Sequence, residues 1–80
     1  TKLEWKAQKE EQARLRKKQN DLKKTEEAIE KLEERDKEID DLLVLEEVYT
    51  DHIRLGELNQ EKQEIASKLE DLYKTWEELA

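Results

Sequence analysis

The sequence has no cysteine, proline, methionine or phenylalanine, and it has a single glycine in 80 residues. Without cysteine the chain can form neither a disulfide scaffold nor a thiolate zinc site, which is compatible with a reducing compartment. The hydrophobic fraction is 34%, whereas an ordinary globular domain is nearly half apolar, so a layered core is excluded. No run of ten apolar residues occurs, so we expect no membrane-spanning segment and no signal peptide in these residues.

Charged side chains dominate what is present: they make up 49% of the residues, and the formal net charge is −7. Such a composition also occurs in disordered chains, but disordered chains lack regular hydrophobic spacing. Here the leucines are periodic, so we expect a thin and elongated helical structure. Because the chain contains no methionine and opens on Thr1, we also expect it to be part of a longer protein.

Hydrophobic residues recur every seven residues in two blocks, which is the spacing of a coiled-coil seam. Seven of eight seam positions are apolar in the second block, formed by Leu55, Lys62, Leu69 and Trp76 with Leu58, Ile65, Leu72 and Leu79. The first block contains Leu15, Leu22, Ile29, Leu32 and Ile39, interrupted by Lys18 and Thr25. The register is lost after Asp40, and Thr50 or Asp51 is a suitable N-cap for a new helix.

We therefore predict an all-α fold in which residues 1–80 form a single two-helix antiparallel coiled-coil hairpin. Its first helix would span about residues 3–40, its turn about 41–50 and its second helix about 51–79. Folding the chain about residue 45 places Leu22 opposite Leu69 and Leu15 opposite Trp76, and it leaves residues 1–11 as an overhang. The apolar residues 42–45 and the tyrosines are expected to cap the tip.

The overhang is expected to be where the rest of the longer protein attaches, and its apolar residues would dock on that missing part. They are Leu3 and Trp5. Tyr73 and Trp76, in contrast, are expected to pack in the core of the hairpin.

Residues that could carry out catalysis are few. His52 is the only histidine and has no second ligand for a metal site. Gly56, inside a heptad block, is interpreted as a helix defect or alternatively as a point of close helix approach. A two-helix hairpin has no enclosed pocket in which carboxylates could acquire different pKa values. We therefore expect no catalytic residue, no metal site and no cofactor in this chain.

The net charge hides a strong asymmetry along the chain. Residues 1–25 contain nine Lys or Arg and four Asp or Glu, a net of +5, whereas residues 26–80 contain seven and nineteen, a net of −12. In the basic part, residues spaced by seven form a stripe on the helix face away from the seam, with members about 10.5 Å apart. The stripe consists of Lys2, Lys9, Arg16 and Lys23, with Lys17 and Lys24 beside it.

Three interpretations of this stripe remain open from the sequence. The charges could simply solvate the helix, partly neutralised by four acidic residues of the second helix, Glu70, Asp71, Glu77 and Glu78. They could contact the backbone of a nucleic acid, or they could contact an acidic protein surface. The acidic remainder of the chain would repel phosphates, so a nucleic acid would meet only the base and flank of the first helix.

Several segments resemble the C-terminal coiled-coil extension of ABC-F proteins, the soluble tandem ATP-binding-cassette ATPases that include the Uup type. KLEWKAQ at residues 2–8, RLRKKQN at 14–20 and KTEEAIE at 24–30 are similar to its opening and its first helix. TDHI at residues 50–53 and LEDLYKTWEEL at 69–79 resemble its second helix. A Tyr followed by Trp-Glu-Glu-Leu is the most recognisable mark.

The resemblance implies a cytoplasmic parent that hydrolyses ATP with magnesium and acts on ribosomes in translation or antibiotic resistance. It also implies that the extension contacts nucleic acid, which is DNA in Uup-type proteins and ribosomal RNA in others. No Walker or signature motif occurs in these residues, so no ATP-binding residue can be assigned. We accordingly expect a monomeric module that binds nucleic acid without sequence readout through Lys2, Lys9, Arg16, Lys17, Lys23 and Lys24.

Two other functions fit the same pattern. A structural spacer or protein-docking arm would use Trp5 and make no contact with nucleic acid. A hairpin arm of a tRNA-binding enzyme, such as a seryl-tRNA synthetase, would have similar mechanics, but the terminal Trp-Glu-Glu-Leu segment argues against it.

Overall fold

The computed structural model describes all 80 residues as three helices without a strand, which confirms the predicted all-α class. The helices are α1 at Lys2–Leu43, α2 at Glu46–Tyr49 and α3 at His52–Leu79. α1 continues three residues beyond the expected end at residue 40, and the expected turn contains the short helix α2. Of the two N-cap candidates, Asp51 is confirmed, because its side chain accepts hydrogen bonds from the amides of Ile53 and Arg54.

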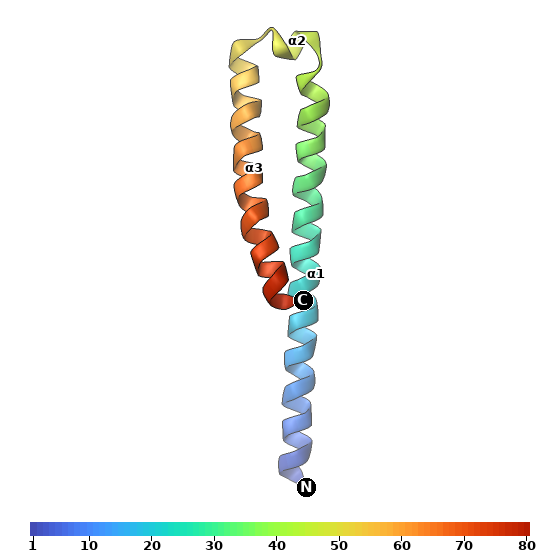
Figure 1. The fold of residues 1–80 in the computed structure, drawn as a ribbon. Coiled ribbons are helices and arrows are strands. Elements are labelled where there is room, and N and C mark those ends of the chain that lie inside the picture. The colour runs from blue at the N-terminus through green and yellow to red at the C-terminus, as the bar shows by residue number, and fades with distance from the viewer.

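α1 and α3 lie side by side and run in opposite directions, with α2 across one end (Figure 1). We call this arrangement the helix pair. The molecule measures 72 × 15 × 15 Å, and its radius of gyration is 20.2 Å. A compact domain of this length would have a radius of gyration of about 12 Å. The structure is therefore a thin rod in which every residue lies near the surface.

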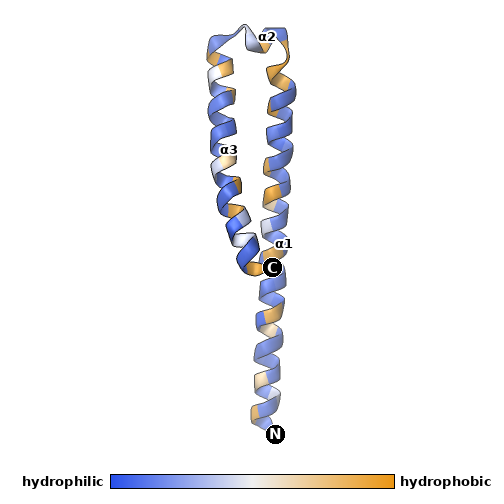
Figure 2. Ribbon diagram, in the orientation of Figure 1, coloured by the Kyte–Doolittle hydropathy of each residue, from blue (hydrophilic) through white to orange (hydrophobic).

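The core of the helix pair is small and lies toward α2. Four residues form it, namely Ile39 and Val48, which have no exposed surface, with Leu58 and Ile65. Leu32, Leu42, Leu43 and Leu69 are partly buried and pack against this cluster. Most of the remaining ribbon is hydrophilic (Figure 2). The cluster holds all three helices together because each of them contributes at least one fully or nearly fully buried side chain.

The tip differs from the expected apolar cap. Leu42 and Leu43 do pack on the core, but Val44 is 74% exposed, and Leu45 and Tyr49 are about half exposed. Val48 fills the tip instead. α2 is a single helical turn, and of its two apolar side chains only Val48 is buried, while Val44 and Leu45 lie in the connection before α2.

The pairing of the two helices is also shifted from the expected one. Trp76 was expected opposite Leu15, but its indole Nε1 donates a hydrogen bond to the carboxylate of Glu26, at 3.1 Å. The expected midpoint, residue 45, is too early, because α1 continues to Leu43 and α2 then occupies part of the connection. The shift brings α3 toward the α2 end of α1.

As a result, the unpaired part of α1 is longer than the expected residues 1–11. Every residue from Thr1 to Asn20 is exposed, and Asp21 is the first that is partly buried. We call residues 1–20 the overhang; at 1.5 Å per residue it is about 30 Å long. Leu15 therefore has no partner on α3 and is 55% exposed.

Polar residues at the seam are accommodated in three ways. Thr25 is buried, and its hydroxyl donates a hydrogen bond to the carbonyl of Asp21 at 2.8 Å. Lys62 crosses to α1 and forms ion pairs with Asp36, at 3.1 Å, and with Asp40. Lys18 lies on the overhang and stays in solvent.

Tyr73 and Trp76 lie at the edge of the helix pair and not in its core. They are 42% and 38% exposed. The hydroxyl of Tyr73 donates a hydrogen bond to Glu33 of α1, and this raises the pKa of Tyr73. The polar ends of the two aromatic residues therefore reach across to carboxylates of α1, and their rings line a shallow hollow together with Ile29, Glu26, Glu30 and Glu33.

An Arg35 guanidinium bridges the two helices. It donates to the carboxylate of Glu61 at 2.5 and 3.0 Å, and to Glu38 one turn away at 3.1 Å. The hydrogen bonds from Arg35 lower the pKa of Glu61, and the same contacts raise the pKa of Arg35. This bidentate pair has a defined geometry and helps to fix the register of α1 against α3.

Gly56 has open space around it: a Cβ added there meets no atom within 4 Å. The close-approach alternative is therefore wrong. Because alanine has the higher helix propensity, we expect Gly56→Ala to raise the free energy of unfolding by about 1 kcal/mol in urea denaturation followed by circular dichroism. Ala66→Gly, at another exposed position of α3, is the reciprocal control and should lower it by a similar amount. A loss of stability in Gly56→Ala would contradict the open environment.

The Arg35–Glu61 pair predicts a pH-dependent contribution to stability. Since the pKa of Glu61 is lowered in the folded chain, its contribution is complete above the usual value of 4.5 and is lost as the pH falls through the folded-state pKa. We expect the thermal midpoint of Glu61→Gln to lie below that of the unmodified chain at pH 7, and this difference to shrink at pH values below about 4. Glu57→Gln is the control, because it has the same net charge as Glu61→Gln and Glu57 has no ion pair to lose. An equal difference at both pH values would argue against the pair.

Candidate nucleic-acid interface

The predicted stripe lies on one continuous helix, because α1 runs unbroken from Lys2 to Leu43. Helical geometry places its residues on one arc of about 120°, on the side opposite the residues that pack against α3. No Asp or Glu of residues 1–25 falls on this arc. Lys6 falls on the same arc and completes the set. We call this set the basic face; it consists of Lys2, Lys6, Lys9, Arg16, Lys17, Lys23 and Lys24.

Lys6 was missing from the predicted site residues. The seven-residue spacing that revealed the stripe does not include it, but it lies four residues after Lys2 and three before Lys9. Residues three and four apart are neighbours on a helix surface. A search for that spacing would have found it.

Every residue of the basic face is exposed, and none takes part in an ion pair. The expected neutralisation by acidic residues of α3 does not occur. Among those residues only Glu70 is paired, and its partner is Lys74 of its own helix at 3.6 Å. The seven positive charges are thus available to a ligand without first breaking a contact to a carboxylate.

Two cations of the helix pair, in contrast, are engaged in ion pairs between its helices. Arg35 and Lys62 together contact four carboxylates of α1 and α3. The pKa of Lys62 is raised by its hydrogen bonds to Asp40 and Asp36. Free positive charge is therefore concentrated at the overhang and the start of the helix pair, while the end near α2 remains acidic.

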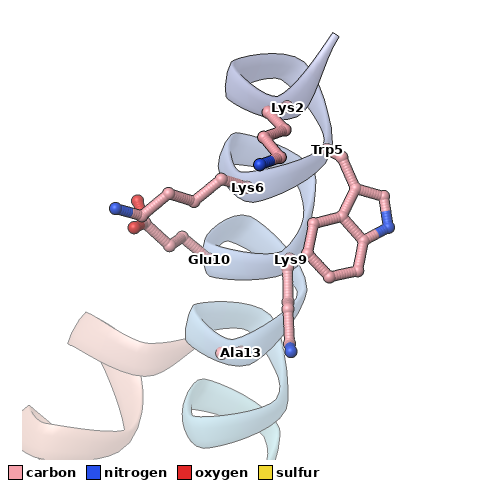
Figure 3. Close-up of a pocket in the computed structure, with 6 residues that line it drawn as sticks. All are labelled: Lys2, Trp5, Lys6, Lys9, Glu10 and Ala13. Atoms are coloured by element: carbon pink, nitrogen blue, oxygen red, sulfur yellow. The ribbon is translucent and has the colours of Figure 1, made fainter.

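An exposed aromatic ring stands beside the basic face. Trp5 is 65% exposed, and the ammonium of Lys9 lies 5.1 Å from the centre of its ring, which is a cation–π contact. Figure 3 shows the indole on one side of α1, with Lys6 and Glu10 pointing to the other side. A shallow groove runs between them and is lined by Lys2, Trp5, Lys6, Lys9, Glu10 and Ala13.

The two expected docking residues do not form one surface. Leu3 and Trp5 are two positions apart on a helix, so they point to nearly opposite sides. Leu3 is 81% exposed and lies on the side that continues the seam of α1. Trp5 instead lies with the basic face. A single flat partner cannot cover both residues while α1 remains helical.

No group of three or more His, Cys, Asp or Glu is arranged to hold a metal ion. None of the helices combines the length and the apolar character needed to span a membrane. His52 is exposed in the first turn of α3.

Comparison with known proteins gives one result. A family model described as "ABC transporter C-terminal domain" matches residues 13–80. The match includes the part of the basic face from Arg16 to Lys24 and does not extend to Leu3 or Trp5. No curated protein and no solved structure matches the chain.

Proposed function

The chain belongs to the ABC transporter C-terminal domain family, and from this premise we propose that it is the accessory C-terminal domain of an ABC-F ATPase of the Uup type. In this proposal the helix pair is a two-helix antiparallel coiled-coil hairpin, and the domain binds DNA or ribosomal RNA without reading the sequence. The parent would be a soluble, cytoplasmic protein that acts in translation or antibiotic resistance. ATP and magnesium would be used by the ATPase domains, and this domain would be monomeric and not itself catalytic.

The observation that carries the proposal is the basic face, which is exposed, free of ion pairs and about 30 Å long from Lys2 to Lys23. A nucleic acid that contacts these cations releases the counterions condensed on its phosphates, and this release drives binding. Contacts to phosphate fix the position of a protein but carry no sequence information. Binding through this face would therefore be strong at low salt and weakly selective.

The acidic remainder of the chain supports a defined position for the nucleic acid. Residues 26–80 carry a net charge of −12, so phosphates would be repelled from the helix pair near α2. The nucleic acid would lie along the overhang and the adjoining part of α1. Two cations of the helix pair, Arg35 and Lys62, are already held by carboxylates.

This proposal predicts a steep dependence of binding on salt. The slope of log K against log salt for a DNA duplex should be about −0.9 for each phosphate contacted, which gives about −5 for six contacts. Reversal of Arg16, Lys17, Lys23 and Lys24 to Glu should abolish binding at 100 mM salt, measured by fluorescence anisotropy of a labelled duplex.

The matched control reverses four cations outside the basic face: Lys31, Lys37, Arg54 and Lys68, which are exposed and make no ion pair. Both variants have the same formal net charge, so a difference between them reports position and not total charge. Equal loss of binding in the two variants, or binding that is insensitive to salt, would overturn the proposal.

A second candidate function is a protein-docking arm, and it rests on the exposed continuation of the seam. Leu3, Ala7 and Leu15 lie on the side of α1 that packs against α3 further along, and they have no partner in the chain. In this proposal a preceding ATPase domain covers them.

The docking arm predicts slow hydrogen exchange in residues 1–20 when the chain is joined to its ATPase domains. In the 80-residue chain every residue of the overhang is exposed, so its amides should exchange fast. Leu3→Asp with Leu15→Asp should restore fast exchange in the joined protein, whereas Ile53→Asp, an exposed residue on α3, should not. Fast exchange both in the 80-residue chain and in the joined protein would exclude docking through the side of α1 that carries Leu3 and Leu15.

A further inference from the structure

Trp5 is exposed and helps to line two hollows on the surface of α1. One is the groove lined by Lys2, Lys6, Lys9, Glu10 and Ala13 (Figure 3). The other is smaller and is lined by Gln8, Lys9 and Gln12. The indole thus projects from the surface of α1. The ammonium of Lys9 makes a cation–π contact with its ring.

The residues around the ring are of types that can bind a nucleotide. A flat aromatic face stacks on any nucleobase, and such stacking tolerates every sequence. The side-chain amides of Gln8 and Gln12 offer both donors and acceptors to the edge of a base. The ammonium groups of Lys2 and Lys9 can contact the phosphates on either side of the stacked base.

The negative charge near the ring does not oppose this arrangement. Glu10 is the only carboxylate that lines either hollow, and it points away from the indole, to the same side as Lys6 (Figure 3). The contact between Lys9 and Trp5 is also a weak obstacle, since cation–π contacts at exposed positions contribute little. A stacking base would take over the ring face and leave the ammonium free for a phosphate.

We infer that Trp5 stacks on an unpaired base of a single-stranded nucleic acid, with Lys2 and Lys9 on the neighbouring phosphates and Gln8 or Gln12 at the edge of the base. The inference rests on the proposed nucleic-acid function and names the form of nucleic acid that the overhang prefers. Bases in a duplex are already stacked on their neighbours and cannot reach the ring without unpairing. Trp5 would therefore distinguish a single strand, or an unpaired end or bulge, from a regular duplex.

The test uses the intrinsic fluorescence of Trp5. In Trp76→Phe this residue is the sole tryptophan, so quenching reports directly on its ring. We expect a 12-residue oligothymidine to quench the fluorescence, and a 12-base-pair duplex at equal phosphate concentration to quench it much less. In anisotropy measurements Trp5→Ala should weaken binding of the oligothymidine about tenfold and change binding of the duplex less than about twofold.

Two further variants separate stacking from helix effects. Trp5→Phe keeps an aromatic face and should retain most of the single-strand affinity, whereas Trp5→Leu keeps apolar bulk without an aromatic ring and should lose it. Because Trp5 has no contact with α3, all these variants should keep the circular dichroism spectrum and thermal midpoint of the parent chain.

Each outcome decides the question. Preference for the single strand that disappears in Trp5→Ala and Trp5→Leu supports the inference. Equal affinity for both forms, or unchanged affinity in Trp5→Ala while charge reversal still abolishes binding, overturns it and leaves the proposed function intact. Absence of salt-dependent binding to either form overturns both.

Discussion

The structure depends on the difference in length between its two long helices. α1 has 42 residues and α3 has 28, and one small cluster around Ile39, Val48, Leu58 and Ile65 fixes where they meet. Because this cluster lies near α2, the shorter helix ends far from the start of the longer one. Nothing in the chain then covers residues 1–20. The overhang is exposed because the core lies at the other end of the rod.

The distribution of charge follows the division of α1 into a part paired with α3 and an unpaired overhang. Where the helices are paired, cations are used to join them: Arg35 reaches Glu61, and Lys62 reaches Asp36 and Asp40. Where α1 is alone, its Lys and Arg side chains form no ion pair, and those of the basic face point away from the seam. Most helical stability in proteins comes from packing and not from intrinsic propensity, so the overhang gains order from its continuity with the paired part of α1. A polyanion along the basic face would add to that order, because it reduces the repulsion between the cations.

The heptads predict the helical class, because it depends on local spacing, but they place the end of the first helix three residues too early and give no sign of α2. They do not predict which turn of α3 meets which turn of α1, because a heptad repeat offers several pairings that differ by whole repeats. The choice is made at the tip, where α2 brings Val48 into the core, and nothing in the spacing of residues 42–51 distinguishes Val48 from Val44 or Leu45. The basic stripe was visible because its spacing matches the seam. The separation of Leu3 from Trp5 could have been derived from helical geometry alone.

The two proposed uses of the overhang are compatible because they lie on different sides of one helix. Leu3 and Leu15 continue the seam, and the basic face lies opposite to them, so a protein domain on the first side leaves the second open to nucleic acid. A straight helix couples the two contacts rigidly, because it can neither bend at a proline nor rotate one side against the other. A movement of a domain docked on Leu3 would therefore carry the basic face and Trp5 with it. In that arrangement one helix serves both as a spacer and as the nucleic-acid contact, and the orientation of the helix pair follows that of the overhang.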